Sequence, residues 1–473
     1  MLDVFERIVG SENVMRDPAA LTPYRDDYTE IDAVDPACVV FATETAQIQA
    51  IVRACAERRM PITARVAGTN VGGLAIPSPG GVVLDLSRMN RVLDVSDADM
   101  YAVIEPGVTQ QQMKDHLAAH NPSLTLGFSL APPHTSVFAN ALMGGLTNRS
   151  LKYGDQSEWI SGLEVVRADG SLLRTGAWAL SDIPFACVPF PGVTGMFVAW
   201  QQTTGIATKM AFQLWPAHPL NERIFILTYS PRGTYTAMAR LCRAEICDDI
   251  GGLSWPSAKM MMGVKYPNPV PDPDEPRFFL YVDLTAETEA EMRAKKDILY
   301  RIVNDVAATG EKFEEPMDVK TLIRVNPALS PFADFPTDLK FLTDHGGGGL
   351  SWIGTYGPMS RMIDAVEAGV AVMERHGFPP LIVSRPMRGG HFIVFRLITI
   401  FDKTKPDEIA RVRAVNEEVL ELATARGFVM YKTPIWAWRK LEDRIDPGLR
   451  RLMREVKTLM DPDGIFNPGK MGL

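Results

Sequence analysis

The chain has 473 residues, of which 46% are apolar and 22% are charged, and its formal net charge is −8. That length predicts two or three domains, and the composition is that of an ordinary globular protein. The negative charge, with no long Lys/Arg run, argues against a nucleic-acid partner or an anionic membrane surface. No apolar run approaches the ~18 residues that a membrane span needs.

The five cysteines are scattered, and none forms a C-x-x-C pair, so neither a zinc site nor an iron–sulfur site is indicated. Sparse cysteines in an odd number are typical of a reducing cytosol. The opening residues, MLDVFERIVG, are acidic and helical and lack the basic and apolar parts of a signal peptide. We therefore expect a cytoplasmic protein.

The first 215 residues mix helical and strand patterns in one α+β unit. In chain order the expected elements are a helix at 46–59, strands at 61–67 and 81–87, a hairpin at 91–108, a helix at 109–120 that Thr109 caps, and a hairpin at 162–176 around Asp169-Gly170. Residues 130–150 are too rich in Pro, Gly and Asn to be regular.

A second unit alternates strands with long helices. Strands are expected at 277–284 and 391–401, and helices at 290–308 and 360–377. A proline-rich segment at 266–276 is a linker or surface loop inside this unit, and turn-forming residues dominate 459–473.

A glycine cluster at 68–73 is typical of an anion-binding loop. Its spacing, Gly68-x-x-x-Gly72-Gly73, matches neither the Rossmann turn nor the P-loop. The prolines in the following AIPSPGG exclude a helix start there. The loop therefore runs from strand to strand, and any anion that it holds meets backbone N–H groups.

Four ordered pieces make the chain resemble the vanillyl-alcohol oxidase and p-cresol methylhydroxylase family of flavin-linked oxidoreductases. The pieces are RVAGTNVGG, VLDLSRMNRVLDV…AVIEPGVT, TGIATKM and DPDGIFNPGKMG. The resemblance implies an α+β fold with a two-part FAD-binding domain of the p-cresol methylhydroxylase (PCMH) type and an inserted α+β substrate (cap) domain. The implied boundaries are 1–215 for the FAD domain, 216–445 for the cap, and 446–473 for a tail that returns to the FAD domain.

The same resemblance implies which residues meet FAD, although any single Thr or Asn among them has the alternative of capping a turn. They are Gly68, Thr69, Asn70, Val71 and Gly72 at the pyrophosphate; Pro133, His134, Thr135, Ser136, Thr147 and Asn148 along the flavin and ribityl chain; Thr204, Gly205 and Ile206 at the adenine; and Asn467 and Lys470 in the tail. Gly349 stands where some relatives attach the flavin to a His, and His345 is displaced by four residues, so we expect non-covalent FAD.

The phenol-oxidising branch holds a phenolate between two tyrosines and an arginine. Tyr431 and Lys432 match its Tyr-Arg pair. The ammonium of the Lys would contact an anion as a point charge, whereas the planar guanidinium of an Arg binds with two N–H groups. A cap-core tyrosine is the alternative for Tyr431. The branch's other tyrosine falls at Val71, and its catalytic Asp falls near Met143, so simple 4-hydroxybenzylic oxidation is in doubt.

Two other residues are candidates for chemistry in the cap. His391 is a candidate proton acceptor and Arg388 a candidate carboxylate ligand, and the alternative for His391 is a hydrogen-bonded structural role. His345, His376 and His391 stand alone, so no metal is expected.

The expected function is that of an FAD-dependent dehydrogenase or oxidase that takes hydride from a hydroxyl-bearing small molecule, foremost an aromatic alcohol or phenolic compound. Two alternatives stay open: a 2-hydroxy-acid dehydrogenase of the same superfamily, and a redox-neutral transferase that uses the flavin as a scaffold. The electron acceptor could be oxygen, a cytochrome or an electron-transferring flavoprotein, and the resemblance implies a homodimer.

Overall fold

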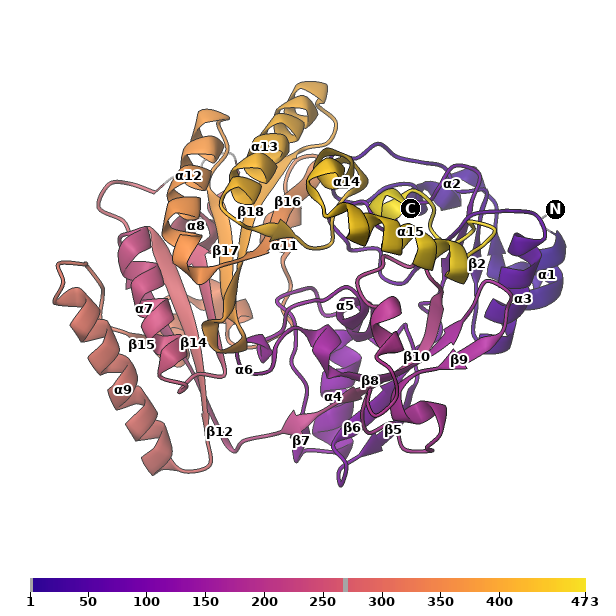
Figure 1. Ribbon diagram of the computed structural model, residues 1–473. Coiled ribbons are helices and arrows are strands. Elements are labelled where there is room, and N and C mark those ends of the chain that lie inside the picture. Colours follow the sequence, from indigo (N-terminus) through magenta and orange to yellow (C-terminus); the bar gives the residue numbers. More distant parts are fainter. Residues whose placement is uncertain (1–2, 267–270) are drawn as a thin grey trace.

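Two halves lie side by side in the computed structural model, which describes residues 3–266 and 271–473 (Figure 1). The first half contains a four-stranded and a five-stranded sheet, and the second half contains one eight-stranded sheet. Part of the predicted proline-rich segment, 267–270, lies outside the described residues. The exact boundaries at 215 and 445 stay a prediction.

The four-stranded sheet has the order β1-β2-β4-β3, with β2, β4 and β3 parallel. Its strands are β1 (Val14–Met15), β2 (Cys38–Phe41), β4 (Val82–Asp85) and β3 (Ile62–Arg65). All four residues of β2 and of β4 are buried, as expected for parallel strands covered on both faces. Helices α1 (Asp3–Val9) and α3 (Thr45–Ala56) pack on this sheet, and α3 buries Ile48, Ile51 and Cys55 at helical spacing.

The five-stranded sheet is antiparallel in the order β5-β6-β10-β8-β9. Its strands are β5 (Val92–Ser96), β6 (Tyr101–Ile104), β10 (Ile206–Gln213), β8 (Ile160–Val166) and β9 (Leu172–Arg174). Both predicted hairpins are confirmed. The predicted helix is α4 (Gln110–His120), which begins where the Thr109 hydroxyl accepts from the backbone N–H of Gln112 at 3.0 Å.

The prediction that residues 130–150 are irregular was wrong for one short segment, and a second helix begins at the last residue of the range. Residues Val137–Leu142 form α5, and Ser150–Tyr153 form α6. The Ser136 hydroxyl accepts from the backbone N–H of Ala139 at 3.0 Å, so a capped apolar turn forms despite the surrounding glycines.

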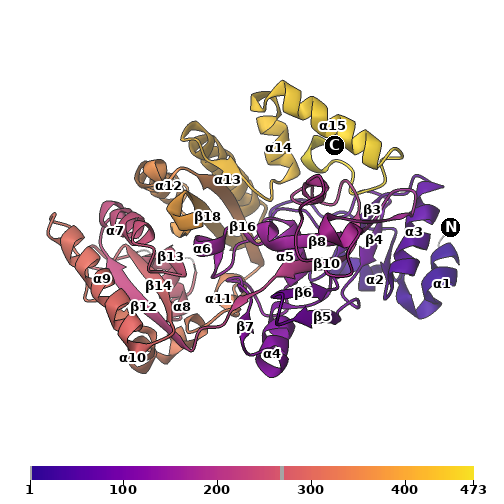
Figure 2. The ribbon, with the colours of Figure 1, turned by 60° about the horizontal axis from the view of Figure 1, so that its bottom comes forward.

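The eight-stranded sheet is antiparallel in the order β15-β12-β14-β13-β17-β18-β16-β19. Its strands are β15 (Met317–Asp318), β12 (Leu220–Thr228), β14 (Phe278–Ala286), β13 (Asp249–Ser254), β17 (Leu381–Met387), β18 (Phe392–Asp402), β16 (Gly348–Gly357) and β19 (Val429–Met430). One face is covered by α7 (Pro231–Arg243), α9 (Glu289–Ala307), α12 (Met362–Arg375) and α13 (Pro406–Ala425) (Figure 2). Hydrophobic residues of the other face, such as Leu253 and Val383, join a core cluster with residues of the first half.

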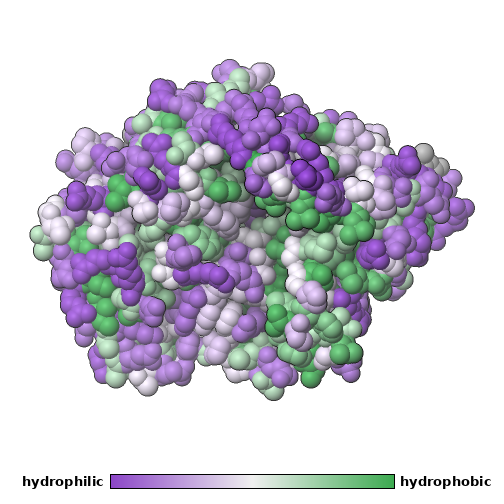
Figure 3. All heavy atoms as spheres, viewed as in Figure 1, coloured by the Kyte–Doolittle hydropathy of each residue, from purple (hydrophilic) through white to green (hydrophobic). Residues whose placement is uncertain are grey.

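The chain then returns to the first half through α14 (Ile435–Leu441) and α15 (Pro447–Met460) (Figure 1). Residues 465–467 lie beside β3, where the Ile62 N–H donates to Ile465 O at 2.7 Å and the Asn467 N–H donates to Ile62 O at 2.9 Å. The C-terminal segment thus pairs with a strand of the first half. On the face drawn in Figure 3, α12 and α13 present mostly hydrophilic side chains, and hydrophobic ones gather below α15.

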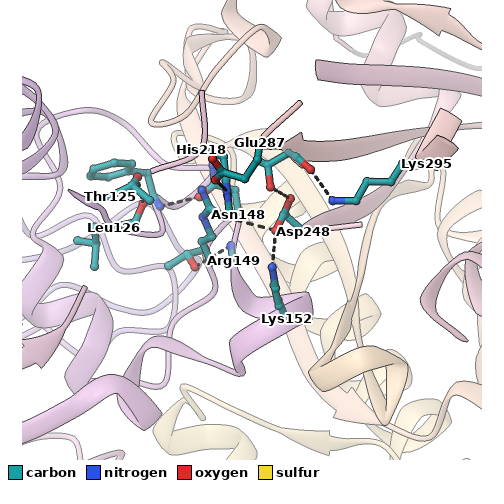
Figure 4. A network of polar contacts seen from close by, with 12 residues as sticks. Thr125, Leu126, Asn148, Arg149, Lys152, His218, Asp248, Glu287 and Lys295 are labelled. Carbon is teal, nitrogen blue, oxygen red and sulfur yellow. Dashed lines mark hydrogen bonds and ion pairs between the residues drawn. The ribbon is translucent and has the colours of Figure 1, made fainter. Parts of the chain in front are cut away.

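A polar network joins the two halves (Figure 4). The carboxylate of Asp248 accepts from Lys152 at 3.2 Å and lies 3.4 Å from Arg149, both in or next to α6 of the first half. The Thr285 hydroxyl donates to the same carboxylate at 2.5 Å. Because Asp248 is buried, its charge depends on these donors, which hold the pKa of the carboxyl below its usual value against the effect of burial. None of the described helices has the length and apolarity to cross a membrane.

Candidate functional site

A cavity of about 590 Å³ lies between the two halves. The first half supplies residues 66–71, 74 and 75 of the glycine loop, the segment 129–136 and part of α5. The second half supplies residues from β13, β16, β17 and β18, the segment 338–343, and Lys432. A site between two domains is a common place for a cofactor and its substrate.

The glycine loop presents free donors to this cavity. Within the described chain, the backbone N–H groups of residues 68–71 make no hydrogen bond, whereas those of Gly72 and Gly73 are occupied by Asn70 Oδ1 at 2.7 Å and Asp27 Oδ2 at 2.8 Å. Gly68 has φ +67°, and a Cβ there would come within 2.2 Å of the Arg65 guanidinium. A run of unpaired N–H groups beside a cation is what a pyrophosphate requires, so these residues fit the phosphate part of FAD.

Eight of the predicted FAD residues line the cavity. They are Gly68, Thr69, Asn70, Val71, Pro133, His134, Thr135 and Ser136. Gly72 and Lys470 instead line an adjoining cavity of about 500 Å³ behind the loop. The Lys470 ammonium donates to the carbonyls of Gly73 and Ile76, so it holds the loop from its far side, and burial lowers the pKa of this lysine to about 8.

The other predicted FAD residues are not among those that line the cavity. Their side chains serve local structure: Thr204 Oγ1 donates to Met196 O at 2.7 Å, and Asn148 Oδ1 accepts from the Phe128 N–H at 2.8 Å. Asn467 accepts from Thr63 at 3.1 Å. Thr147, Gly205 and Ile206 are likewise buried away from the lining. Their contact with FAD stays a prediction.

On the sheet side, two arginines face the cavity from neighbouring strands. Arg396 of β18 pairs in register with Val383 of β17, and Arg385 lies two residues further along β17. Arg385 is held by Asp249 and donates to Thr147 O at 2.6 Å. Arg396 lies over the ring of Trp352 at 4.2 Å and donates to the Tyr431 hydroxyl.

Tyr431 and Lys432, adjacent in sequence, take different positions. Lys432 lines the cavity, whereas Tyr431 is outside the lining and lies behind Arg396. Burial, as the larger cause, and the nearby guanidinium of Arg396 together lower the pKa of the Lys432 ammonium to about 8. An amine with that pKa is neutral in part near physiological pH and can accept a proton.

The structure does not bring Arg388 and His391 to the cavity. They occupy the turn between β17 and β18, where both are exposed. Arg388 forms an ion pair with Glu158, and His391 makes no side-chain hydrogen bond within the described chain. The hairpin turn projects these residues beyond the end of the sheet, so their geometry gives no support to the catalytic roles expected from the sequence.

The cavity residues that the sequence analysis did not single out include Arg65 and Arg396. Arg396 interrupts the otherwise apolar strand FIVFRLITIF, and a lone charge in such a run is a signal for a buried functional group. His345 lies outside the lining, with Nε2 at 3.1 Å from Gly349 O. Among the described residues, no group of three or more His, Cys, Asp or Glu is placed to hold a metal ion.

Comparisons with known proteins agree with this geometry. The family described as FAD binding domain matches residues 36–176, and the C-terminal domain of FAD linked oxidases matches residues 257–471. The flavoprotein subunit of 4-cresol dehydrogenase from Pseudomonas putida is 25% identical over 99% of this chain and 94% of its own. Glycolate oxidase subunit GlcD from Escherichia coli is 24% identical over 98% of this chain and 89% of its own.

A crystal structure of p-cresol methylhydroxylase with substrate bound shows the same fold, with a TM-score of 0.86 and 23% identity over 100% of this chain and 96% of that one. Together with the two family matches, this covers both halves around the cavity. The chain therefore belongs to the FAD-linked oxidoreductases that carry a p-cresol methylhydroxylase-type FAD-binding domain.

Proposed function

We propose that the protein oxidises a hydroxyl-bearing small molecule, foremost an aromatic alcohol or phenolic compound. The observation that carries this proposal is Lys432, a lysine of lowered pKa that faces the cavity beside Arg396. Apolar and aromatic side chains such as Leu253, Trp352 and Ile398 supply a wall for a ring. The name of the 4-cresol dehydrogenase relative is consistent with an aromatic substrate.

The roles follow from position. Residues 68–71 and Arg65 would hold the pyrophosphate of FAD, which supplies the hydride acceptor when bound. Lys432 Nζ would take the hydroxyl proton of the substrate as hydride leaves the carbinol carbon, so that the C–O bond becomes C=O. Arg396 would fix the anionic end of the substrate. Lys432 thus takes the role of proton acceptor that the sequence suggested for His391. Arg396 takes the role of anion ligand that it suggested for Arg388.

Anaerobic stopped-flow spectroscopy tests the proposal, with the holoenzyme mixed with aromatic alcohols, alkylphenols and 2-hydroxy acids. We expect an aromatic alcohol or phenol to bleach the flavin band, and Lys432→Met to slow bleaching by about 10²- to 10⁴-fold. Lys440→Met, which removes an exposed ion pair with Glu417, is the matched control. Failure of every compound to bleach the flavin would overturn the proposal and favour a scaffold-type transferase.

A 2-hydroxy acid is the second candidate, because relatives include glycolate oxidase and D-2-hydroxyglutarate dehydrogenase. If only 2-hydroxy acids bleach the flavin band, this second function is the correct one. Re-admission of air then separates an oxidase from a dehydrogenase with another acceptor. We also propose non-covalent FAD, a homodimer and a cytoplasmic location, which rest on the sequence and the family resemblance.

A further inference from the structure

The cavity lining contains far more positively than negatively charged side chains. Five are cationic, namely Arg65, Lys340, Arg385, Arg396 and Lys432, and one, Asp338, is acidic. Asp338 lies 3.2 Å from Lys340 in an ion pair, and Arg385 is neutralised by the buried Asp249. Arg65 lies beside the glycine loop, where the pyrophosphate would meet it. Two of the five cations remain. Among the described residues, Arg396 and Lys432 form no ion pair with a carboxylate.

We propose that the substrate carries a carboxylate, which Arg396 binds. This proposal rests on the proposed function, because it concerns the substrate of the same site. The Nε of Arg396 is buried and has no partner in the described chain, while Nη2 donates to the Tyr431 hydroxyl. The Nε–H and a second N–H of Nη2 lie on one edge of the guanidinium. That edge matches the two oxygens of a carboxylate, whereas a phenolate offers one oxygen.

The guanidinium is held in place before any substrate arrives. Trp352 packs against one side at 4.2 Å, and the ring of Tyr431 stacks on that of Tyr356 with centroids 4.5 Å apart. The Tyr356 hydroxyl donates to Gly144 O at 2.7 Å, which ties the stack to the first half of the molecule. Tyr431 and Tyr356 are positioning residues in this arrangement. A guanidinium fixed in this way loses little freedom when it binds an anion.

The neighbourhood also favours a carboxylate over a phenolate. The second tyrosine of the phenol clamp is replaced by Val71, which lines the cavity without a hydroxyl. Arg396 and Lys432 line the same cavity. A substrate that spans them would place its carboxylate on Arg396 and its reacting hydroxyl on Lys432.

A binding experiment on the oxidised holoenzyme tests this without turnover. Sodium benzoate and its neutral isostere benzamide are titrated while the visible spectrum of the flavin reports binding. We expect benzoate to bind about 10- to 100-fold more tightly, as one charge-assisted contact predicts. Arg396→Met should lower the affinity for benzoate to that for benzamide. Arg396→Lys should recover part of the difference in affinity. Arg375→Met, which removes an exposed ion pair with Glu418, is the control.

Equal affinities for benzoate and benzamide, or benzoate binding that survives Arg396→Met, would overturn the proposal. If Arg396→Met does not fold, Tyr431→Phe serves instead. It should weaken the binding of benzoate more than the binding of benzamide. Turnover gives an independent comparison, because 4-(hydroxymethyl)benzoate should bleach the flavin at lower concentration than its methyl ester. Benzoate binding without bleaching by any alcohol would refute the proposed function alone. Bleaching by neutral alcohols without benzoate binding would refute the carboxylate alone.

Discussion

At Gly72 the glycine loop lies against the backbone of Lys432, a residue of the second half. A Cβ at this residue would lie 2.9 Å from the backbone oxygen of Lys432 and 3.3 Å from Asn70 Oδ1. The carbonyl cannot turn away easily, because Lys432 already has φ +51°. We therefore expect Gly72→Ala to displace the glycine loop rather than the lysine.

The size of the effect follows from the overlap. One methyl group forced into a packed backbone contact typically destabilises by about 1–3 kcal/mol. For a domain of some 200 residues this lowers the melting temperature by about 2–10 °C. If the strain falls on the loop in its FAD-binding shape, FAD affinity drops by about 5- to 150-fold.

Flavin fluorescence on heating and FAD titration of the apoprotein measure these two quantities. Gly192→Ala is the matched control, because Gly192 has φ −69° and a Cβ there meets nothing within 4 Å. We expect this control to keep the wild-type melting temperature and FAD affinity. If Gly72→Ala also keeps both, the close approach of loop and lysine has no energetic consequence and the reasoning fails.

The other predictions concern proton transfer, domain contact and the flavin. The rate of flavin bleaching should rise with pH through about 8, because the neutral amine of Lys432 accepts the proton; a rate that falls or stays flat across this range contradicts the assignment. Asp248→Asn should lower the melting temperature by several degrees, whereas Asp305→Asn, at an exposed pair with Arg240, should not; equal effects would remove the special role of the interdomain network. His391→Asn should leave the bleaching rate unchanged, and a large loss would return His391 to the site. Acid precipitation should release the yellow colour into the supernatant, and a yellow pellet would show covalent flavin.

Much of the first half was predictable because its signals are local. The glycine loop lies between two strands, the Thr109 cap begins a helix, and Asp169-Gly170 turns a hairpin; each depends on residues within a few positions. The glycine pattern pointed to residues 68–71 and the family resemblance to residues 133–136, and both segments line the cavity; their contact with FAD stays a prediction.

The cap site was harder to predict because it depends on which face of a strand meets the cavity. His391 precedes a buried strand, yet Gly389 and Gly390, with φ +65° and +83°, make it part of a hairpin turn that points to solvent. Arg396 is five residues further along the same sequence and faces inward. Only the pairing of β17 with β18 and the placement of the first half against this face distinguish the two residues.

The contact between β3 and residues 465–467 has a consequence for biosynthesis. Thr63 and Asn467, which share a hydrogen bond, are 404 residues apart in the chain. At 5–20 residues per second, a ribosome needs roughly 20–80 s to make the second partner after the first. During that interval β3, which leads into the glycine loop, lacks its contact with residues 465–467. Lys470, which donates to the carbonyls of Gly73 and Ile76, has not yet been made. Nascent chains are therefore expected to acquire FAD late in synthesis or after release from the ribosome.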